Sequence, residues 1–379
     1  MRRLIPFLVI TLGAVGADTV SAQPIGDKVV ITKATTLYTE LQQEHHIVAA
    51  MPVSAGTVLT VRDDGKTGWY LVGANSFANG VEGWVDALYC VSVDAAIPHF
   101  TEVIRRAPQN AEGYNARGNV WFAKGDDKLA IGDFSQAIAR QPKNAEYLSN
   151  RGRAYTSHGD YGPAVQDLNA ALEAGGMSAE VLTRRGDAWL MSGELDKALA
   201  DFNAALNLDS TNSIAFCHRG IALVEQKNYA AGIASLEDAV RNNPRLAFAY
   251  SHLAWTLAAC PDVQFNDGPK AVKYAKAACT LNGWRRWNDF GTLGAAYAAA
   301  GDFERALDYQ SRAMQVAPRR SDREEARQRI EMYKRGQPYR FGQSPPPAPP
   351  APAPGAAEAP KPAPVRETAA AGLAAAHAS

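Results

Sequence analysis

Residues 116–137, ARGNVWFAKGDDKLAIGDFSQA, carry the pattern that decides how most of this chain folds. The Arg-Gly pair in this stretch returns with a period of 34 residues, together with a large residue, a turn, a small residue and an alanine at constant offsets. The pairs are Arg117-Gly118, Arg151-Gly152, Arg185-Gly186 and Arg219-Gly220. A period of this length predicts a solenoid of helical hairpins, because one hairpin cannot bury its own apolar faces without stacked neighbours.

The repeated residues resemble the tetratricopeptide repeat, in the variant that carries Arg-Gly in its first helix. The small residues let the two helices of a hairpin approach closely, and the large ones fill the seam between them. The resemblance implies a mainly α-helical solenoid of six repeats over residues 111–320, which binds protein segments and is not an enzyme. The repeats are expected at 111–144, 145–178, 179–212, 213–246, 247–286 with an insertion, and 287–320.

Shorter segments flank the array on both sides. Residues 94–110 match only the second helix of a repeat, so we expect a half-repeat helix there. Residues 321–340 are rich in Arg and Glu and predict the polar capping helix that a solenoid needs at its end. The Pro- and Ala-rich residues 343–379 cannot bury a core and are expected to be disordered, either as a polyproline II spacer or as a ligand for a groove-binding partner.

Residues 24–93 alternate short apolar runs with Gly- and Asp-rich breaks, which predicts a small all-β barrel. The order AGTVLTV, GWYLV and EGWV resembles the bacterial SH3 domain. The last expected strand runs almost directly into the half-repeat helix at about Asp94, and two roles for the barrel stay open at this point. The barrel caps the half-repeat helix, or it binds peptidoglycan in an aromatic cleft around Tyr38, Trp69 and Trp84 while the repeats act as a spacer.

Residues 1–22 have the order of a secretory signal. Arg2 and Arg3 precede an apolar run, and small residues up to Ala22 mark a cleavage position. The apolar run is shorter than the roughly 20 residues that span a bilayer. We therefore expect an exported protein of the periplasm or cell envelope, or a secreted one, with no membrane span after cleavage. The alternative is an uncleaved N-terminal anchor.

Composition argues against several classes of function. The chain has 39 basic and 39 acidic residues and no long block of one sign, which disfavours nucleic acid and anionic lipid as partners. Its seven His and four Cys residues form no ligand-spaced cluster, and no nucleophile elbow or phosphate-binding loop appears. His45 and His46 are adjacent, which on a strand points them to opposite faces. We expect no metal site, no cofactor and no catalytic set.

The four cysteines are Cys90, Cys217, Cys260 and Cys279. Export would permit disulfides, and four cysteines allow three ways of pairing. Cys260 ends one expected helix near its turn, whereas Cys279 lies far along the returning helix, so these two cannot meet. We expect reduced cysteines that are mostly packed in the core.

The period also predicts ion pairs. Within each hairpin an Arg of the first helix and an Asp of the second are equidistant from the turn, so they lie at the same height. These residues are Arg117, Arg151, Arg185, Arg219, Asp133, Asp167 and Asp201. We expect a structural Arg–Asp ladder, paired within a repeat or to the preceding repeat, because Arg binds a carboxylate in bidentate geometry. An anion-binding stripe is the alternative, which the periodic carboxylates disfavour.

The resemblance to tetratricopeptide repeats implies a concave groove, lined by the first helices, that takes peptides or protein segments. The groove positions include Asn115, Asn119, Phe122, Arg153, Leu190, Ile221, Val224 and Trp255. Asn115 stands where the dicarboxylate clamp of some family members needs a Lys, and Glu180 would oppose an anion, so an acidic C-terminal peptide is disfavoured. Our hypothesis is an extended segment with aliphatic anchors near Trp255, which requires that Trp255 is not fully buried.

Overall fold

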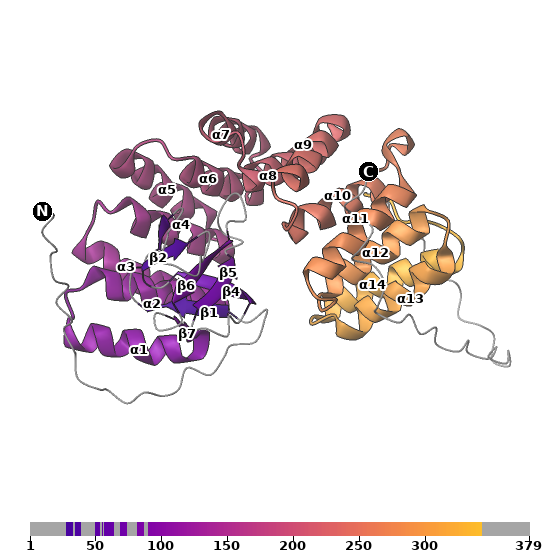
Figure 1. Ribbon diagram of the computed structural model, residues 1–379. Helices are drawn as coiled ribbons and strands as arrows, with labels where there is room; N and C mark the ends of the chain where they lie inside the picture. The colour runs from indigo at the N-terminus through magenta and orange to yellow at the C-terminus, as the bar shows by residue number, and fades with distance from the viewer. Residues whose placement is uncertain are drawn as a thin grey trace, which may run out of the picture. The chain divides into compact units, whose positions relative to one another are not determined.

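The computed structural model describes residues 28–32, 35–38, 50–53, 55, 57–63, 69–73, 82–86 and 90–342. Most of this part is α-helical (Figure 1). The helices are α1 (Val93–Arg106), α2 (Ala111–Lys124), α3 (Asp127–Arg140), α4 (Ala145–His158), α5 (Tyr161–Gly175), α6 (Ala179–Met191), α7 (Leu195–Leu208), α8 (Ser213–Glu225), α9 (Tyr229–Asn242), α10 (Ala247–Ala259), α11 (Gly268–Leu281), α12 (Trp287–Ala299), α13 (Phe303–Val316) and α14 (Arg320–Lys334).

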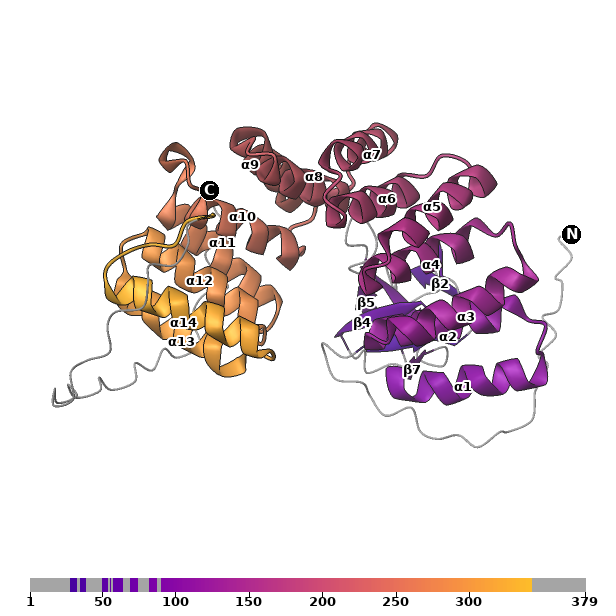
Figure 2. The same cartoon turned by 180° about the vertical axis from the view of Figure 1, so that it is seen from behind.

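Successive helices pair as antiparallel hairpins, from α2 with α3 to α12 with α13, and each hairpin packs on the next (Figure 2). The helix α1 precedes the first hairpin and packs on α2, and α14 follows the last hairpin and packs on α13. Within the described residues, no helix is both long and apolar enough to cross a membrane. The helices of the described part form a solenoid of stacked hairpins, as the period predicts.

Residues that recur with the same period set the helix boundaries. The side chains of four N-cap residues accept hydrogen bonds from backbone N–H groups in the first turns of α2, α4, α6 and α8. These residues are Asn110, Asn144, Ser178 and Asn212. A left-handed residue follows α2, α4, α6 and α8, and glycine supplies it after the first three of these helices. After α8 this residue is Lys227, with a φ of 64°, which costs roughly 1 kcal/mol relative to glycine.

Within the described residues, seven short strands precede the helices. They are β1 (Lys28–Ile31), β2 (Thr35–Tyr38), β3 (Ala50–Val53), β4 (Val58–Asp63), β5 (Trp69–Gly73), β6 (Glu82–Asp86) and β7 (Cys90–Ser92). All neighbours pair antiparallel, in the order β3-β2-β6-β5-β4-β1-β7. Tyr38 lies opposite Trp84 in this ladder, and Trp69 lies opposite Asp86.

The β region covers the first helix of the array. Ser92 ends β7 and is also the N-cap of α1, where its hydroxyl accepts a hydrogen bond from the Ala95 N–H at 3.3 Å. Val30 of β1 packs in one buried cluster with Phe100 of α1 and Val120 of α2. Ala96 and Phe100 of α1, which has no preceding helix among the described residues, are thereby buried, whereas most other residues of α1 stay at least partly exposed.

The Arg–Asp pairs form within each repeat and not between repeats. Both Nε and Nη2 of the guanidinium donate to the carboxylate, with N···O distances of 2.6–2.8 Å. The pairs are Arg117 with Asp133, Arg151 with Asp167, and Arg185 with Asp201. The three carboxylates are buried, so each bidentate pair fixes the two helices of its hairpin at one height.

The remaining nitrogen of each guanidinium links neighbouring repeats. Its Nη1 donates to a side-chain oxygen on the second helix of the preceding repeat, at 2.7–3.1 Å. These bonds join Arg117 to Thr101, Arg151 to Ser135, Arg185 to Asn169 and Arg219 to Asn203. Each Arg therefore holds its own hairpin together and also sets the distance to the hairpin before it.

The fourth repeat lacks the carboxylate. Ser235 stands at the position of Asp201 in the repeat before, and Arg219 Nε donates to its hydroxyl at 3.1 Å. Burial lowers the pKa of Arg219, whereas the Asp-paired Arg185 has its pKa raised by the hydrogen bond to Asp201. The guanidinium of Arg219 is thus partly desolvated without a bonded counter-ion among the described residues.

A Ser235→Asp substitution is expected to raise the free energy of unfolding by about 1–2 kcal/mol, because it supplies a charge-assisted partner for Arg219. Urea denaturation followed by circular dichroism would measure the change. Ser235→Asn is the matched control, since it adds similar volume without charge. Equal stability of the two variants would contradict the expectation.

The glycine of each Arg-Gly pair makes room for the second helix. A Cβ added at Gly186 would lie 2.5 Å from Cε1 of Phe202, a fully buried side chain. The other three glycines of the series face Phe134, Leu168 and Leu236 in the same way. The pattern of glycine and bulky residue in the sequence therefore corresponds to direct contact between paired helices.

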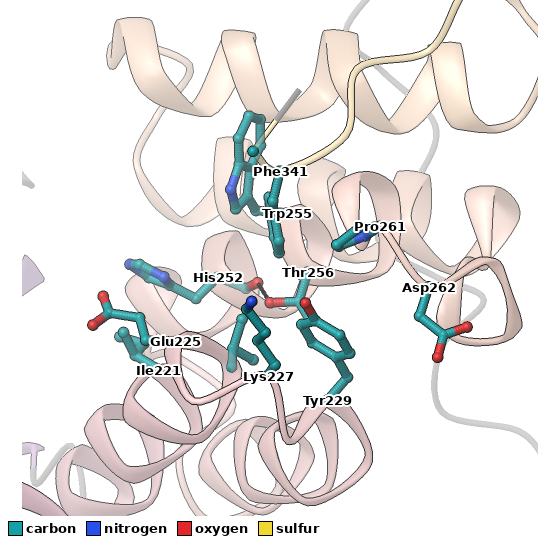
Figure 3. A pocket seen from close by; sticks show the side chains of 12 residues that line it. Ile221, Glu225, Lys227, Tyr229, His252, Trp255, Thr256, Pro261, Asp262 and Phe341 are labelled. Atoms are coloured by element: carbon teal, nitrogen blue, oxygen red, sulfur yellow. Dashed lines mark hydrogen bonds between the residues drawn. The ribbon is translucent and has the colours of Figure 1, made fainter. Parts of the chain in front are cut away.

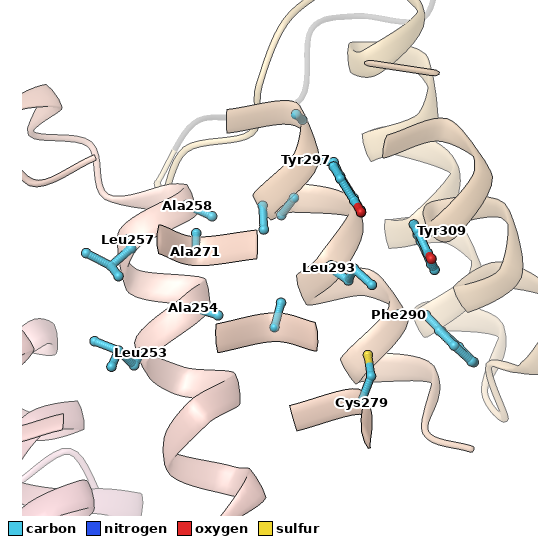
Figure 4. Close-up of a cluster of buried hydrophobic side chains, with 14 of the residues drawn as sticks. Leu253, Ala254, Leu257, Ala258, Ala271, Cys279, Phe290, Leu293, Tyr297 and Tyr309 are labelled. Carbon is cyan, nitrogen blue, oxygen red and sulfur yellow. The ribbon is translucent and has the colours of Figure 1, made fainter. Parts of the chain in front are cut away.

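Apolar packing replaces the ladder in the later repeats. Leu253 stands 34 residues after Arg219 and belongs to a buried cluster that extends from α8 to α14. Figure 4 shows Leu253 and Leu257 of α10 and Leu293 of α12 in this cluster, with Tyr297 and Tyr309 at its other side. The C-terminal half is thus held together by a continuous apolar core.

The last helix is shorter than the expected 321–340. It ends at Lys334, because Gly336, with a φ of 67°, and Pro338 cannot continue a helix. Residues 337–342, QPYRFG, then run without regular secondary structure against the end of α10, and we call them the strap. Arg340 Nη1 donates to the carbonyl of Ala258 at 2.7 Å, and the Phe341 N–H donates to the carbonyl of Ala259 at 2.8 Å.

Candidate functional site

The polar groove residues of the first repeats bind one another. Asn115 is buried, donates to Glu146 at 3.0 Å and accepts from Asn150 at 3.0 Å. Asn119 accepts a long hydrogen bond of 3.4 Å from Arg153 Nη2. These bonds connect α2 with α4. Asn115 is therefore a link between repeats and not an open recognition residue.

Arg153 is enclosed by its neighbours on α2 and α6. Its guanidinium lies 4.2 Å from the ring centroid of Phe122. Burial lowers the pKa of Arg153 to about 9, and the nearby charge of Arg184 adds to the effect. Its Nε finds no hydrogen-bond partner in the described part of the chain. Phe122 and Arg153 thus form a cation–π contact across the repeat interface.

Leu190 does not reach an open surface, contrary to its predicted place in the groove. It is 7% exposed and packs in a buried cluster with Ala198, Phe202 and Ala222. The last turn of α6 lies against the start of α7 and the following repeat, which covers the side chain. Among the early groove residues, Asn115 and Leu190 are therefore buried, whereas Asn119, Phe122 and Arg153 stay partly exposed.

The late part of the predicted groove opens into a cavity of about 790 Å³, which we call the Trp255 pocket. Ile221 and Val224 of α8 and Trp255 of α10 line it, together with the strap residue Phe341 (Figure 3). Trp255 and Phe341 form one side, and Ile221 and Tyr229 lie toward the other. Three of the residues predicted from the repeat register therefore meet at one open site.

Charged side chains at the edge of the Trp255 pocket give it a small excess of negative charge. Its lining includes the acidic Glu225 and Asp262 and the basic Lys227. Burial raises the pKa of Glu225, and no ion pair reaches its carboxylate within the described residues. Burial also lowers the pKa of His252 to about 4, so this imidazole is neutral at neutral pH. The pocket therefore suits an apolar group with a cation beside it.

The strap covers one face of Trp255, a contact that the repeat pattern does not indicate. The ring of Trp255 lies 5.5 Å from that of Tyr339 and 6.0 Å from that of Phe341, centroid to centroid. The guanidinium of Arg329 lies 4.6 Å from the same Trp255 ring. Trp255 is nevertheless only half-buried, which meets the condition set by the groove hypothesis. The sequence signal was available in the two aromatic residues that flank Arg340 after the helix-breaking Gly336.

Groups that could support catalysis or metal binding are scattered. Cys217, Cys260 and Cys279 are free, buried thiols, and burial raises the pKa of each. Among the described residues, no three His, Cys, Asp or Glu side chains gather as a metal site would require. His45 and His46 lie outside the described residues.

Comparison with known proteins supports the repeat assignment. Residues 92–145, 128–176 and 149–213 match the family model described as the tetratricopeptide repeat. The prediction of tetratricopeptide repeats is thereby confirmed for the first half of the array. No curated protein matches the chain by sequence.

Solved structures resemble the chain in fold. One chain of the hetero-tetramer Cut9-Hcn1 of the APC/C has a TM-score of 0.55 and 11% identity over 64% of this chain, which spans 46% of that chain's length. A tetratricopeptide repeat protein from Parabacteroides merdae has 19% identity, covers 64% of this chain and 92% of its own, and has a TM-score of 0.46. MamA has 23% identity over 44% of this chain and 95% of its own, with a TM-score of 0.36.

Proposed function

We propose that this protein is a non-enzymatic scaffold that binds an extended segment of a partner protein in the Trp255 pocket. The observation that carries the proposal is the open, largely apolar cavity at Ile221, Val224 and Trp255, positions that the repeat register assigns to the groove. The tetratricopeptide repeat fold supports it, since this fold is typical of protein-interaction scaffolds. From the N-terminal sequence alone, the proposal places the scaffold in the periplasm or cell envelope.

The proposal assigns a capping role to the N-terminal β region. We propose that it is a bacterial SH3-like domain preceding repeats of the Arg-Gly variant. Its support is the buried cluster that Val30 and Ala55 share with Phe100 of α1, at the first end of the array. The side chains of Tyr38, Trp69 and Trp84 lie outside what is described, and no observation on the described residues supports peptidoglycan as a ligand.

A display library of random peptides, selected on the full chain, tests the proposal. Selected peptides are expected to bind an Ile221→Lys variant about tenfold more weakly, because the charge removes one apolar wall of the pocket. Leu208→Lys is the matched control, since Leu208 is 53% exposed on α7 and lies outside the pocket lining. Fluorescence anisotropy with labelled peptides gives the affinities.

Two results would contradict the proposal. The first is a selection that enriches no peptide above a matrix without protein. The second is equal binding by the Ile221→Lys and Leu208→Lys variants, both checked for native helicity by circular dichroism, which would place the binding surface elsewhere.

A further inference from the structure

The strap behaves as a ligand that the chain supplies to its own groove. The segment has no regular secondary structure, and its backbone joins α10 through the Phe341 N–H and the carbonyl of Ala259. Tyr339 and Phe341 both lie against Trp255. Arg340, between them, extends its guanidinium to the Ala258 carbonyl at the end of α10, where carbonyl groups lack helical partners. A backbone bond, two aromatic anchors and one cation are the elements of peptide recognition.

The chemistry of this contact is set by complementary groups on both sides. The guanidinium of Arg329 lies 4.6 Å from the Trp255 ring and 4.9 Å from the Tyr339 ring, so the cation contacts one ring of the groove and one of the strap. The carbonyl end of a helix attracts a cation, which is the place that Arg340 takes. An aromatic-Arg-aromatic order therefore fits this surface on electrostatic grounds as well as by shape.

The strap is less deeply buried than the helices that it contacts. The side chains from Pro338 to Phe341 are all half-buried, and none is fully buried. Gly336 and Gly342, with φ of 67° and 70°, stand on either side of these residues, and both conformations are ones that glycine adopts readily. Segments with few buried apolar contacts open at a smaller free-energy cost than the core does.

The open pocket begins where the strap ends. Phe341 and Gly342 form part of its wall, so a ligand that filled the pocket would meet the strap directly. A longer segment could occupy the pocket and the Trp255 face together, which gives it contacts that the strap does not make. The acidic Glu225 and Asp262 at the pocket edge would favour a further basic residue in such a segment.

From these contacts we infer that the Trp255 surface recognises an extended partner segment with an aromatic-Arg-aromatic order, and that this segment binds in exchange for the strap. The inference rests on the proposed function and names the partner's chemistry and the regulation of the same site. The strap acts as a competitor present at fixed effective concentration, so it lowers the apparent affinity for a partner. Only a segment that matches its chemistry, or exceeds its contacts, displaces it.

A synthetic peptide with the strap sequence, GQPYRFGQ, acetylated, amidated and labelled with a fluorophore, tests the inference in trans. The full chain with Tyr339→Ala and Phe341→Ala is expected to bind this peptide about tenfold more tightly than the wild-type chain does, because its own strap no longer competes. A peptide with Ala in place of Tyr, Arg and Phe is the ligand control. Phe248→Ala, at an aromatic residue 41% exposed on α10, is the protein control and is expected to bind like wild type. Equal binding by the wild-type and strap-weakened chains, or no binding by the latter, overturns the inference.

Hydrogen exchange on the unmodified chain gives a second, independent readout. Peptides from the display selection that bind the pocket are expected to raise the exchange rate of the Phe341 amide, which is protected by the Ala259 carbonyl in the free chain. Peptides that bind while the Phe341 amide stays protected overturn strap exchange and leave the proposed function standing. The opposite outcome is that no selected peptide binds the chain while the strap peptide does. This outcome supports strap recognition at Trp255 and contradicts the proposed function of the wider groove.

Discussion

Replacing Gly268 with alanine is expected to lower the free energy of unfolding by about 3 kcal/mol, at the upper end of what overpacking costs. Gly268 is buried at the first turn of α11. A Cβ added there would lie 2.4 Å from the backbone nitrogen of Ala300 and 2.6 Å from the carbonyl carbon of Ala299, at the end of α12. Backbone atoms cannot rotate away as a side chain does, so the two helices would have to separate. Urea denaturation followed by circular dichroism would measure the loss.

Gly132→Ala is the matched control and is expected to have the opposite sign. Gly132 is exposed within α3, and apart from its chain neighbours and the backbone of its own helix no heavy atom lies within 4 Å of the position where its Cβ would be. Alanine is favoured over glycine in such a helix by about 1 kcal/mol. A Gly268→Ala variant as stable as the wild type would show that α11 and α12 are not in rigid contact.

The Asp167→Ala substitution is also expected to cost about 3 kcal/mol, because it leaves Arg151 partly buried without its counter-ion. The carboxylate of Asp167 is buried, but the side chain of Arg151 is 21% exposed. The expected loss of stability is therefore at the lower end of the range for breaking a buried ion pair. The same change also loosens the side chain that bonds Ser135 of the preceding repeat. Denaturant unfolding at fixed ionic strength measures the effect.

Two comparisons separate this effect from the loss of any surface ion pair. Asp308→Ala removes a partner of Arg312 that is 53% exposed, and is expected to change stability by no more than about 0.5 kcal/mol. The double variant with Arg151→Ala and Asp167→Ala is expected to be more stable than the sum of the single changes, since no charge is left unpaired. If the Asp167→Ala and Asp308→Ala variants were equally stable, the Arg–Asp ladder would contribute no more to the stability of the array than a surface ion pair does.

The hairpins were predictable because their period is carried by residues with a direct steric role, such as Gly186 against Phe202. The sequence also indicates that an Asp side chain lies beside Arg151, at the same level along the axes of the paired helices. It does not decide between Asp167 and Asp133, since that choice depends on how far apart adjacent hairpins stack. The structure sets Asp167 within bidentate reach and gives the preceding repeat the Nη1 contact instead.

The candidate site was predictable only in part. Register places Ile221 and Trp255 on the inner face, where the pocket is found. The repeat register does not show whether neighbouring residues cover that face. It therefore places Leu190 in the open groove, whereas the side chain is buried. The contact between Trp255 and Tyr339 joins residues that no period relates, so the repeat register does not predict it, and the path of the chain after α14 shows which residues meet.

The guanidinium bonds between repeats have a consequence for how this array could change over generations. The Nη1 of Arg117, Arg151, Arg185 and Arg219 donates to a side-chain oxygen at one repeat position of the preceding unit, so these junctions share the same kind of polar contact. Units with equivalent ends can be duplicated, lost or exchanged without a new interface. Beyond Arg219 each junction depends on the particular shapes in one apolar core, as at Leu253. The first half of the array is therefore built of interchangeable parts, whereas the half that holds the pocket must vary as a whole.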